Sequence, residues 1–521
     1  DTMQQNMNPI NIADRRELFV DDYLVEETAG SLRRVFHHPV PRDIVMTFDR
    51  PWEGNVSGYF TVFRDNDNYR MYYRGANYTI HDGKLSNTHP HVVCYAESKD
   101  GLDWHKPDLG LIEFDGSTKN NIVMSGDGVA NGVVFRDLNP QARPDARYKA
   151  IGTGADHRGQ NIGGGHCVYA LKSADGIHWE KMCADPVYDK SHRGLSEVPG
   201  EQVLTWLDSQ NTAFWSPLEQ CYVMYYRVYT YDGEVQYPGW TRPDDYYRNR
   251  VRHIEKAVSD DFVNWTRVGL LDCGADMPNV EQQFYTNVIA PYYRAPHIYI
   301  GMPGRYTDPG WTQSHDHLPD LQRRKREAEV ALRAGTALTD TLLMWSRDGQ
   351  RFRIGDEPFL PPGPQRSGSW MYGDGWVNWH LVETRSDDDH PQLSLYSGEF
   401  YRIDAVRLRH YTLRVDGFAS LHANREGGRF VTRPVDFSGD RLALNFATSA
   451  AGSVRVEIQR PDGSAIDGFT VEDCDEVIGD ELDRTVTWRG NSDVSALAGD
   501  PVRMRFELKD ADVYAMRFAN K

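Results

Sequence analysis

The chain has 521 residues, of which 40% are hydrophobic and 12% aromatic, and its formal net charge at pH 7 is −18. This length exceeds one ordinary hydrophobic core, so we expect two domains, and the apolar content excludes global disorder. The acidic balance argues against binding to nucleic acid and does not favour a polyanionic substrate, although local basic clusters can still bind sulfate or carboxylate groups. No window approaches 18 consecutive apolar residues, so no membrane-spanning helix is expected.

The six cysteines, at positions 94, 167, 183, 221, 273 and 474, include no Cys-x-x-Cys pair. The spacing therefore gives no zinc site, and we expect buried free thiols. The loop sequence His315-Asp316-His317 lacks a third ligand, so we expect neither a metal nor another cofactor. An acidic surface suits an extracellular setting, and we predict a secreted or periplasmic protein.

A strand is predicted first at residues 18–25, where Asp21 and Asp22 interrupt an apolar run. Further along, a seven-residue phrase occurs four times, with Asp two residues and an aromatic residue six residues after its Ser. The copies span residues 98–104, 173–179, 259–265 and 346–352. Asp-Gly between apolar runs predicts a hairpin turn, so each copy marks the outer hairpin of a sheet.

Each copy follows two apolar segments that read as strands. The inner strands are predicted at 59–65, 132–137, 212–217 and 286–291, and the second strands at 69–73, 148–152, 222–227 and 297–302. A fifth unit has strands near 376–382 and 392–397, and strand 18–25 is predicted to complete it. The fold predicted for residues 1–404 is therefore all-β, a five-bladed β-propeller. A sixth meander has no room before residue 410.

Two insertions interrupt the repeat, a polar loop at 231–250 and a segment at 313–335 that contains helix-favouring residues 318–332. Long loops on one face of a propeller usually shape its site. From residue 405 to 521 the strands alternate apolar and polar residues, at 441–446, 453–458, 485–488 and 502–508. This pattern predicts a C-terminal β-sandwich, jelly-roll-like, as an accessory domain.

One acidic residue precedes each predicted inner strand: Glu53, Asp127, Asp208, Glu281 and Asp374. Carboxyl groups that converge on a central axis repel one another, which raises pKa values toward those of a general acid. Asp208 and Glu281 are the strongest candidates, because polar side chains crowd the starts of their strands. Asp340, which opens an apolar strand, is a further candidate. Such residues also commonly cap turns, so the structural alternative stays open.

Several other side chains are predicted to bind substrate. Trp52 precedes Glu53, Asn55 follows it, and Gln210 and Asn211 follow Asp208. Arg305 is suited to clamp a carboxylate, a sulfate or a sugar hydroxyl, although a structural ion pair is the alternative. Further candidates are His166, after a glycine run that lacks a phosphate-loop context, Asp374, and Asp22, for which a salt bridge to an arginine is the alternative.

Four segments resemble bacterial proteins related to glycoside hydrolase families 32 and 43: residues 18–26, residues 50–53, the Ser-x-Asp-Gly-x-x-Trp hairpins and residues 294–301. The resemblance extends to residues 447–458 and so covers most of the chain. It implies a five-bladed propeller with a jelly-roll-like appendage and action on a glycosidic bond. The Asn-Asp-Pro, Arg-Asp-Pro and Glu-Cys patterns of those families are replaced here by Glu53-Gly54-Asn55, Leu207-Asp208-Ser209 and Glu281-Gln282.

We therefore predict a glycoside hydrolase that cleaves a polysaccharide or a derived oligosaccharide, in an exo-acting manner. Glu281 is the predicted general acid, Asp208 orients it or stabilises charge, and Glu53 or Asp340 is the base or nucleophile. A non-catalytic carbohydrate-binding propeller and a glycoside phosphorylase are the alternatives, and Arg305 keeps the latter open. A carbohydrate is the only partner class expected, with no nucleic acid and no membrane.

Overall fold

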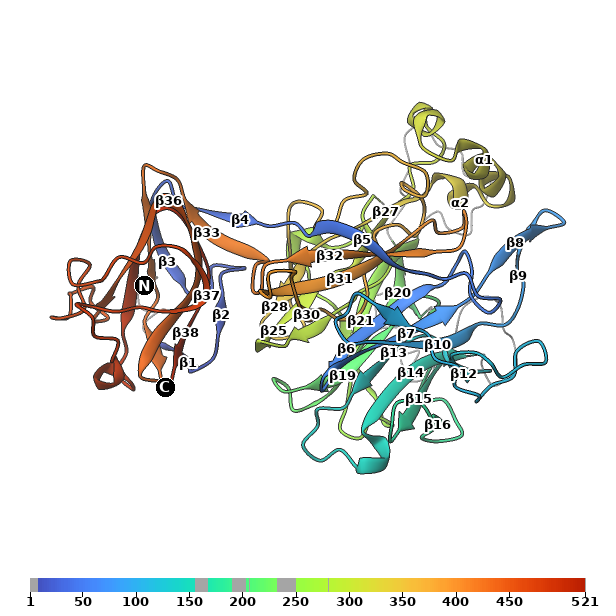
Figure 1. Cartoon of the computed structure of the whole chain (residues 1–521), viewed down its shortest axis with the longest axis horizontal. Coiled ribbons are helices and arrows are strands. Elements are labelled where there is room, and N and C mark those ends of the chain that lie inside the picture. The colour runs from blue at the N-terminus through green and yellow to red at the C-terminus, as the bar shows by residue number, and fades with distance from the viewer. Residues whose placement is uncertain are drawn as a thin grey trace. The chain divides into compact units, whose positions relative to one another are not determined.

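A computed structural model describes residues 8–154, 167–189, 203–205, 207–231, 250–279 and 281–520 (Figure 1). β-strands predominate in it. By their contacts the residues form two units. Unit 1 comprises Asp1–His38, Tyr293–Ala295 and Leu413–Lys521, and unit 2 comprises Pro39–Tyr292 and Pro296–Thr412.

Unit 2 contains five antiparallel sheets that follow the order of the chain. The first is β6 (Gly58–Asp65), β7 (Asn68–Gly75), β10 (Val92–Ser98) and β11 (Trp104–His105), with β12 (Ile122–Ser125) on β10. The second is β13 (Ala130–Arg136), β14 (Tyr148–Gly154), β15 (Cys167–Ser173) and β16 (Glu180–Lys181), with β17 (Tyr188–Asp189) on β15. The third is β19 (Thr212–Ser216), β20 (Cys221–Tyr231), β21 (Arg250–Ser259) and β22 (Thr266–Leu270), with β18 (Val203–Thr205) on β20.

The fourth sheet is β24 (Ala290–Tyr292), β25 (Ala295–Gly301), β28 (Met344–Ser346) and β29 (Arg353–Ile354). The fifth is β30 (Val382–Arg385), β31 (Pro391–Glu399), β32 (Arg407–Leu413) and β5 (Val40–Thr47). Smaller sheets pair β8 (Tyr78–His81) with β9 (Lys84–Asn87), and β26 (Gly304–Thr307) with β23 (Gln283–Phe284) and β27 (Leu338–Thr341). The predicted helix-favouring insertion forms α1 (Leu321–Val330) and α2 (Leu332–Thr336). Most of the other insertion, 231–250, lies outside the described residues.

Each copy of the repeat phrase forms the same turn, held by its Ser and Asp side chains. In the first copy the Ser98 hydroxyl accepts the N–H of Gly101 at 2.9 Å, and the Asp100 carboxylate accepts those of Leu102 and Asp103 at 2.8 and 2.9 Å. The same pattern recurs at Ser173 with Asp175, Ser259 with Asp261, and Ser346 with Asp348. The predicted hairpin turns are confirmed, and the carboxylate is needed because it satisfies two turn N–H groups.

Tyrosine hydroxyls join neighbouring sheets of unit 2. The donors lie on second strands, and the bonds are Tyr148 to Asp65 at 2.5 Å, Tyr222 to Asp137 at 2.7 Å, Tyr299 to Glu219 at 2.6 Å, and Tyr69 to the Glu383 carbonyl at 2.6 Å. The last of these bonds connects the first sheet to the fifth. The main chain makes the same connection, because Val62 donates to the carbonyl of Trp379 at 2.7 Å.

The strand that completes the fifth sheet is β5, and the prediction of residues 18–25 for this place is wrong. β5 pairs with β32, placing Thr47 opposite Arg407. Most of β5 is exposed and it contains Pro41, which an edge strand tolerates, so its apolar signal is weak. The chain before it turns to unit 1, where β2 (Glu17–Leu18) pairs with β38 (Arg503–Ala519). Residues 1–38 therefore lie in unit 1, whereas the sequence predicts one domain over 1–404 and a boundary at 405.

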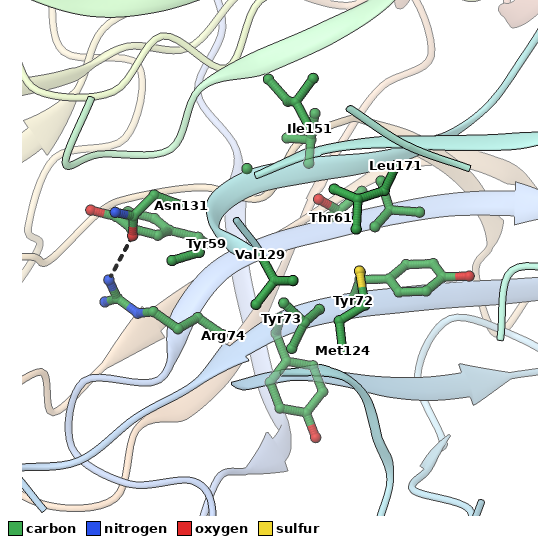
Figure 2. Close-up of a pocket in the computed structure, with 15 residues that line it drawn as sticks. Tyr59, Thr61, Tyr72, Tyr73, Arg74, Met124, Val129, Asn131, Ile151 and Leu171 are labelled. Carbon is green, nitrogen blue, oxygen red and sulfur yellow. Dashed lines mark hydrogen bonds between the residues drawn. The ribbon is translucent and has the colours of Figure 1, made fainter. Parts of the chain in front are cut away.

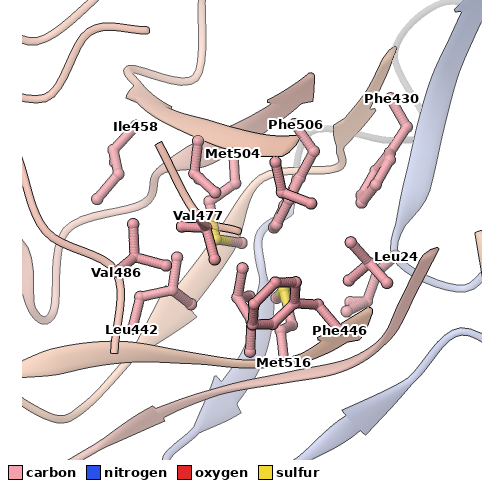
Figure 3. Close-up of a cluster of buried hydrophobic side chains, with 14 of the residues drawn as sticks. Leu24, Phe430, Leu442, Phe446, Ile458, Val477, Val486, Met504, Phe506 and Met516 are labelled. Carbon is pink, nitrogen blue, oxygen red and sulfur yellow. The ribbon is translucent and has the colours of Figure 1, made fainter. Parts of the chain in front are cut away.

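Unit 1 is built on β38, a long strand with which four other strands pair. β36 (Arg441–Gln459), β34 (Gly428–Thr432) and β33 (Ala419–Ala423) pair with it, and further strands are β1 (Ile10–Ala13), β3 (Val25–Gly30), β4 (Arg33–Phe36), β35 (Val435–Phe437) and β37 (Asp480–Thr485). The predicted strands 441–446 and 453–458 form one strand, β36, with a register shift between Thr448 and Ser453. Their alternating apolar side chains enter a core in which Phe430 stacks on Phe506 at 4.4 Å (Figure 3).

Candidate active site

The inner strands of the first two sheets begin with a β-bulge that re-aims one side chain. Tyr59 in β6 and Asn131 in β13 have positive φ angles of 53° and 52°, and the strand register shifts at both places. Bulges of this kind are common beside active sites. Both re-aimed side chains meet Arg74, whose guanidinium lies 4.3 Å from the Tyr59 ring and 3.3 Å from the Asn131 side-chain oxygen. Figure 2 shows Arg74 and Asn131 at a pocket between the first and second sheets.

Aromatic rings continue from Tyr59 across the starts of the inner strands. Trp376 stacks on Tyr285 at 4.6 Å and on Tyr59 at 6.1 Å, and Tyr285 in turn stacks on Tyr306 at 5.9 Å. The hydroxyl of Tyr372 donates to that of Tyr285. With the arginines and the carboxylate that contact them, these residues form what we call the tyrosine–arginine cluster. Its members are Tyr59, Arg74, Asp208, Arg227, Tyr229, Arg252, Tyr285, Tyr306, Arg333, Tyr372, Trp376 and Tyr401.

Asp208 is the one member of this cluster that carries a carboxylate. It precedes β19, its side chain is 23% exposed, and it contacts the guanidinium of Arg227. Arg227 also lies 4.8 Å from the Tyr285 ring. The structure thus places Asp208 beside a cation that itself lies against an aromatic ring.

Two tyrosines of the cluster are unusually acidic. Burial alone would raise the pKa of Tyr229, but Arg252, Arg227 and Arg333 outweigh it and lower that pKa to about 8. For Tyr372, burial is likewise outweighed by Arg333 and Arg402, and the pKa falls to about 8. The potential in this part of an acidic protein is therefore strongly positive.

Asp374 lies in the same loop as Tyr372 and Trp376 but is 4% exposed. One of its carboxylate oxygens accepts the N–H of Met371 at 3.0 Å, and the other is buried without a partner among the described residues. Burial, with a smaller contribution from the like charge of Glu399, raises the pKa of Asp374 to about 7. The raised pKa expected of an acid in this set is thus found at Asp374, but burial rather than repulsion among the five acids is its main cause.

Glu53 is enclosed in a network of its own. Its side chain is fully buried, accepts a hydrogen bond from Tyr73 at 2.5 Å and pairs with Lys106 at 2.7 Å. The indole N–H of Trp52 donates to Asn121 at 2.8 Å, and the side chain of Asn55 bridges to the backbone of Tyr78. All three predicted site residues, Glu53, Trp52 and Asn55, are thus engaged in contacts with other residues in and around the first sheet.

Arg305 and Asp340 form a bidentate ion pair, in which Nε donates at 2.8 Å. They are cross-strand partners on β26 and β27, and the adjacent pair, Tyr306 and Thr339, points to the opposite face of that sheet. The pair Arg305–Asp340 therefore faces away from the ring of Tyr306. The structural alternative for Arg305, an ion pair, is what the structure contains.

Glu281 is exposed, and its N–H donates to the side chain of Asn279 at 2.8 Å. It lies one residue before Gln282, which accepts from Arg305 at 3.4 Å, and two before Gln283, which accepts from Arg252 at 2.7 Å. Its place is thus at the margin between the Arg305–Asp340 pair and the tyrosine–arginine cluster.

Of the remaining predicted site residues, those that the structure describes make structural contacts, and one lies outside the described residues. Gln210 and Asn211 are buried, and their side-chain N–H groups donate to backbone carbonyls, including that of Leu207. Asp22 is in unit 1 and pairs with Arg34 at 2.6 Å. His166 lies outside the described residues. His315 accepts the N–H of Thr312 at Nδ1 and donates from Nε2 to the carbonyl of Thr336. Among the described residues no three potential metal ligands come together.

Sequence reasoning missed the arginines of the cluster. Arg74 and Arg227 occupy the same place in the repeat, five residues after the first tyrosine of each second strand, Tyr69 and Tyr222. Aligning the second strands on their first tyrosine therefore brings the two arginines to the same position, which could have pointed to both. Arg252 stands opposite Tyr229 in β20–β21 pairing, which the sequence alone does not fix.

The structure describes no helix of the length and apolarity needed to cross a bilayer in the residues it covers. No protein-family model matches the chain. Two curated proteins of Mycobacterium tuberculosis, the uncharacterized proteins MT1551 and Rv1502, are each 29% identical to it over 133 residues. The match covers 26% of this chain and 36% of each relative, so the chain spans little more than a third of their length.

Solved structures with similarity to the chain include glycoside hydrolases. A family 43 arabinoxylan arabinofuranohydrolase from Bacillus subtilis has 12% identity and a TM-score of 0.37, covering 90% of this chain and 96% of its own. A structure described for the GH130 family of mannoside phosphorylases has 12% identity and a TM-score of 0.38, covering 72% and 94%. The Bombyx mori family 32 β-fructofuranosidase has 9% identity and a TM-score of 0.36, covering 93% and 94%.

Proposed function

We propose that the protein is a glycoside hydrolase whose site is the tyrosine–arginine cluster. The observation that carries the proposal is the row of stacked rings, Tyr59, Trp376 and Tyr285, beside the partly exposed carboxylate of Asp208. Flat aromatic faces bind the apolar faces of sugar rings, and a few polar groups at their edge set orientation. The substrate is a polysaccharide or a derived oligosaccharide.

Asp208 is the proposed base or nucleophile. Glu53 has no exposed side-chain surface, and Asp340 faces away from the Tyr306 ring, so neither suits this role as well. Glu281 remains the proposed general acid, because it is exposed and lies two residues before Gln283, the partner of Arg252. The separation of the two carboxyl groups in a substrate complex decides the stereochemistry: about 5 Å gives retention and about 6.5–9.5 Å gives inversion.

We also propose that the five sheets of unit 2 are the blades of a propeller and that unit 1 is a β-sandwich. The chain order of the sheets and the bond from Tyr69 to Glu383, which links the first sheet to the fifth, support the former. The core around Phe430 and Phe506 supports the latter. Exo-action is supported by Arg333, which comes from an insertion and lies 5.6 Å from the Tyr372 ring. We propose a secreted or periplasmic location, which fractionation of the producing cells tests.

The first experiment is reducing-sugar release from a panel of algal and plant glycans, with and without inorganic phosphate. Asp208→Asn and Glu281→Gln are assayed beside Asp103→Asn, a matched change in an exposed repeat turn. We expect the first two variants to lose turnover while retaining binding, and the third to behave as the parent protein. Turnover in Asp208→Asn equal to that of the parent would remove the proposal.

The same assay separates the alternatives. Release that requires phosphate identifies a phosphorylase. Binding to a glycan without release under either condition identifies a carbohydrate-binding propeller, for which Asp208→Asn changes nothing but affinity.

A further inference from the structure

Arg252 is a buried cation without a carboxylate partner among the described residues. It is 4% exposed, and its guanidinium donates to the side-chain oxygen of Gln283 at 2.7 Å. Its Nε is buried and has no hydrogen-bond partner in the part of the chain that the structure describes. The ring of Tyr306 lies 4.1 Å from the guanidinium carbon, and the rings of Tyr285 and Tyr229 lie 5.3 and 5.4 Å away.

Arg74 is in a comparable position. It is buried, and its guanidinium donates to the carbonyl of Val56 at 2.8 Å and to Asn131 at 3.3 Å (Figure 2). Its remaining neighbours are the hydroxyl of Tyr401 at 3.5 Å and the ring of Tyr59. Every acceptor that surrounds it within the described residues is neutral.

Two other buried or half-buried arginines of unit 2 are neutralised by acids, whereas Arg324, also buried, donates to backbone carbonyls among the described residues. Arg70 pairs with Asp65 at 2.8 Å, and Arg409 pairs with Glu399 at 2.5 Å. Arg252 instead has a second cation, Arg333, close enough to oppose its charge. A buried charge is costly unless it is paired, and rings and amides offset only part of that cost.

Arg252 and its neighbouring arginines also act on the phenol of Tyr229. Burial should raise the pKa of this phenol, yet the surrounding arginines bring it down to about 8. Negative charge is thus stabilised where Tyr229 stands. A guanidinium offers two parallel N–H donors that match the oxygens of a carboxylate or a sulfate.

We infer that Arg252, with Arg333 beside it, forms a subsite for the anionic group of an acidic sugar, a carboxylate or a sulfate ester, whose ring stacks on the neighbouring aromatic side chains. The inference rests on the proposed function, because it assigns the substrate class of the same cluster. An anion-binding role also accounts for the gathering of arginines at one site of a chain whose net charge is −18.

The test is binding, measured calorimetrically near pH 7, of acidic monosaccharides and their neutral twins. The probes are galacturonate, glucuronate, galactose 6-sulfate, galactose, glucose and inorganic sulfate. We expect at least one acidic sugar to bind about tenfold or more tightly than its neutral twin, which corresponds to one strong ionic contact. If a uronate binds more tightly than galactose 6-sulfate, the subsite takes a carboxylate. If the sulfated sugar binds more tightly, it takes a sulfate ester.

Arg252→Gln should reduce the ratio of acidic to neutral affinity to near one, and Arg252→Lys should restore part of it. Arg64→Gln, a change at an exposed arginine of β6, is the matched control and should leave the ratio unchanged. If Arg252→Gln does not fold, as judged by circular dichroism, Arg333→Gln takes its place with the same expected loss.

Equal binding of acidic and neutral sugars would overturn the inference, as would inorganic sulfate binding as tightly as any acidic sugar. An unchanged ratio in folded Arg252→Gln would do the same. Binding requires no turnover, so failure of the two proposals can be told apart. A protein that prefers acidic sugars but cleaves no glycan keeps the subsite and loses the hydrolase, and one that cleaves neutral glycans without that preference does the reverse.

Discussion

The hydroxyl of Tyr225, on β20, donates a 2.6 Å hydrogen bond to the backbone carbonyl of Gly349 in the repeat turn of the next sheet. Tyr72 makes the same bond to Gly176 at 2.8 Å, and Tyr396 makes it to Gly101 at 2.7 Å. The repeat turn is therefore both the hairpin of its own sheet and the acceptor that attaches this sheet to the preceding one.

Replacing Tyr225 by Phe should lower the free energy of unfolding by about 1–3 kcal/mol, because it leaves the buried carbonyl of Gly349 without its donor. Urea denaturation followed by circular dichroism measures the change. Tyr78→Phe is the control, since no hydrogen bond of the Tyr78 hydroxyl is found among the described residues. Equal midpoints for Tyr225→Phe and the parent protein would show that the bond contributes nothing to stability.

Phe262 stands in the third repeat turn where the other three copies have Gly, and it keeps the left-handed backbone, with φ of 69°. The preceding sheet has Ile151, which carries no hydroxyl, at the place of Tyr72 and Tyr225, and the Phe262 ring packs on Phe135 at 5.5 Å. Phe262→Gly relieves about 1 kcal/mol of backbone strain but loses about 3–5 kcal/mol of buried packing.

We therefore expect a net loss of about 2–4 kcal/mol for Phe262→Gly, measured by thermal unfolding. Phe262→Leu, which keeps most of the apolar volume, should lose less. A Phe262→Gly protein as stable as the parent would mean that the ring packing does not compensate for the missing hydroxyl.

Lys106 is the counterion of buried Glu53, and Lys106→Met should destabilise the protein by about 3–5 kcal/mol because a buried carboxylate is left unpaired. The double variant Glu53→Gln with Lys106→Met removes both charges and should recover much of this loss. If Glu53 only supports the first sheet, the double variant also retains glycan turnover, whereas loss of turnover in a folded double variant would return Glu53 to the catalytic set.

Asp374 should make stability fall as pH rises through neutrality. Its folded pKa of about 7 lies above the usual value near 4, so the folded state holds this proton more tightly than the unfolded chain. The contribution is complete below pH 4 and is lost as pH rises to 7 and beyond, with a total on the order of 4 kcal/mol. Asp374→Asn lacks this dependence while its side-chain oxygen can still accept from Met371.

Unfolding midpoints of the parent and of Asp374→Asn, measured from pH 4 to pH 8, test this expectation. From pH 4 to pH 8 the unfolding midpoint of the parent should fall relative to that of Asp374→Asn. A difference that stays constant with pH would show that the carboxyl group does not change its charge there.

Tyr372 should ionise near pH 8 in the folded protein, and absorbance near 295 nm detects the phenolate. Because the folded pKa of about 8 lies below the usual value of 10, this tyrosine contributes stability above pH 10 that is lost as pH falls to 8. Tyr372→Phe should remove one early-ionising tyrosine from the titration curve. An unchanged early phase in Tyr372→Phe would contradict the placement of Arg333 and Arg402 beside it.

The parts of the fold that the sequence predicts are those determined by neighbours in the chain. The turn at Ser98 and Asp100 depends on side-chain bonds that span three residues, so its phrase predicts it wherever it occurs. The strand β5 depends on a partner in β32, far along the chain, and its own residues are mostly exposed, so no local pattern distinguishes it from strand 18–25.

The residues of the candidate site were likewise predictable from the sequence only where neighbours in the chain determine them. Asp208 could be singled out because polar residues at the start of a buried strand are visible in the sequence. The pairing of Arg305 with Asp340, and of Glu53 with Lys106, depends on which strands lie side by side, and it turns predicted site residues into internal ion pairs. The arginines beside Tyr285, Arg227 and Arg252, lie on the adjacent strands β20 and β21, whereas Tyr285 follows β23, so their gathering is visible only once these strands are in place.

The pairing of Thr47 with Arg407 has a kinetic consequence. During synthesis on the ribosome β5 emerges before any of the five sheets, yet its partner β32 emerges after four of them, and β3 waits longer still for β34. Contacts between such distant segments slow folding, since the loop between them must be ordered first. The early strands therefore spend most of synthesis unpaired, and the charged and proline residues of β5 protect it from pairing with another chain in that interval.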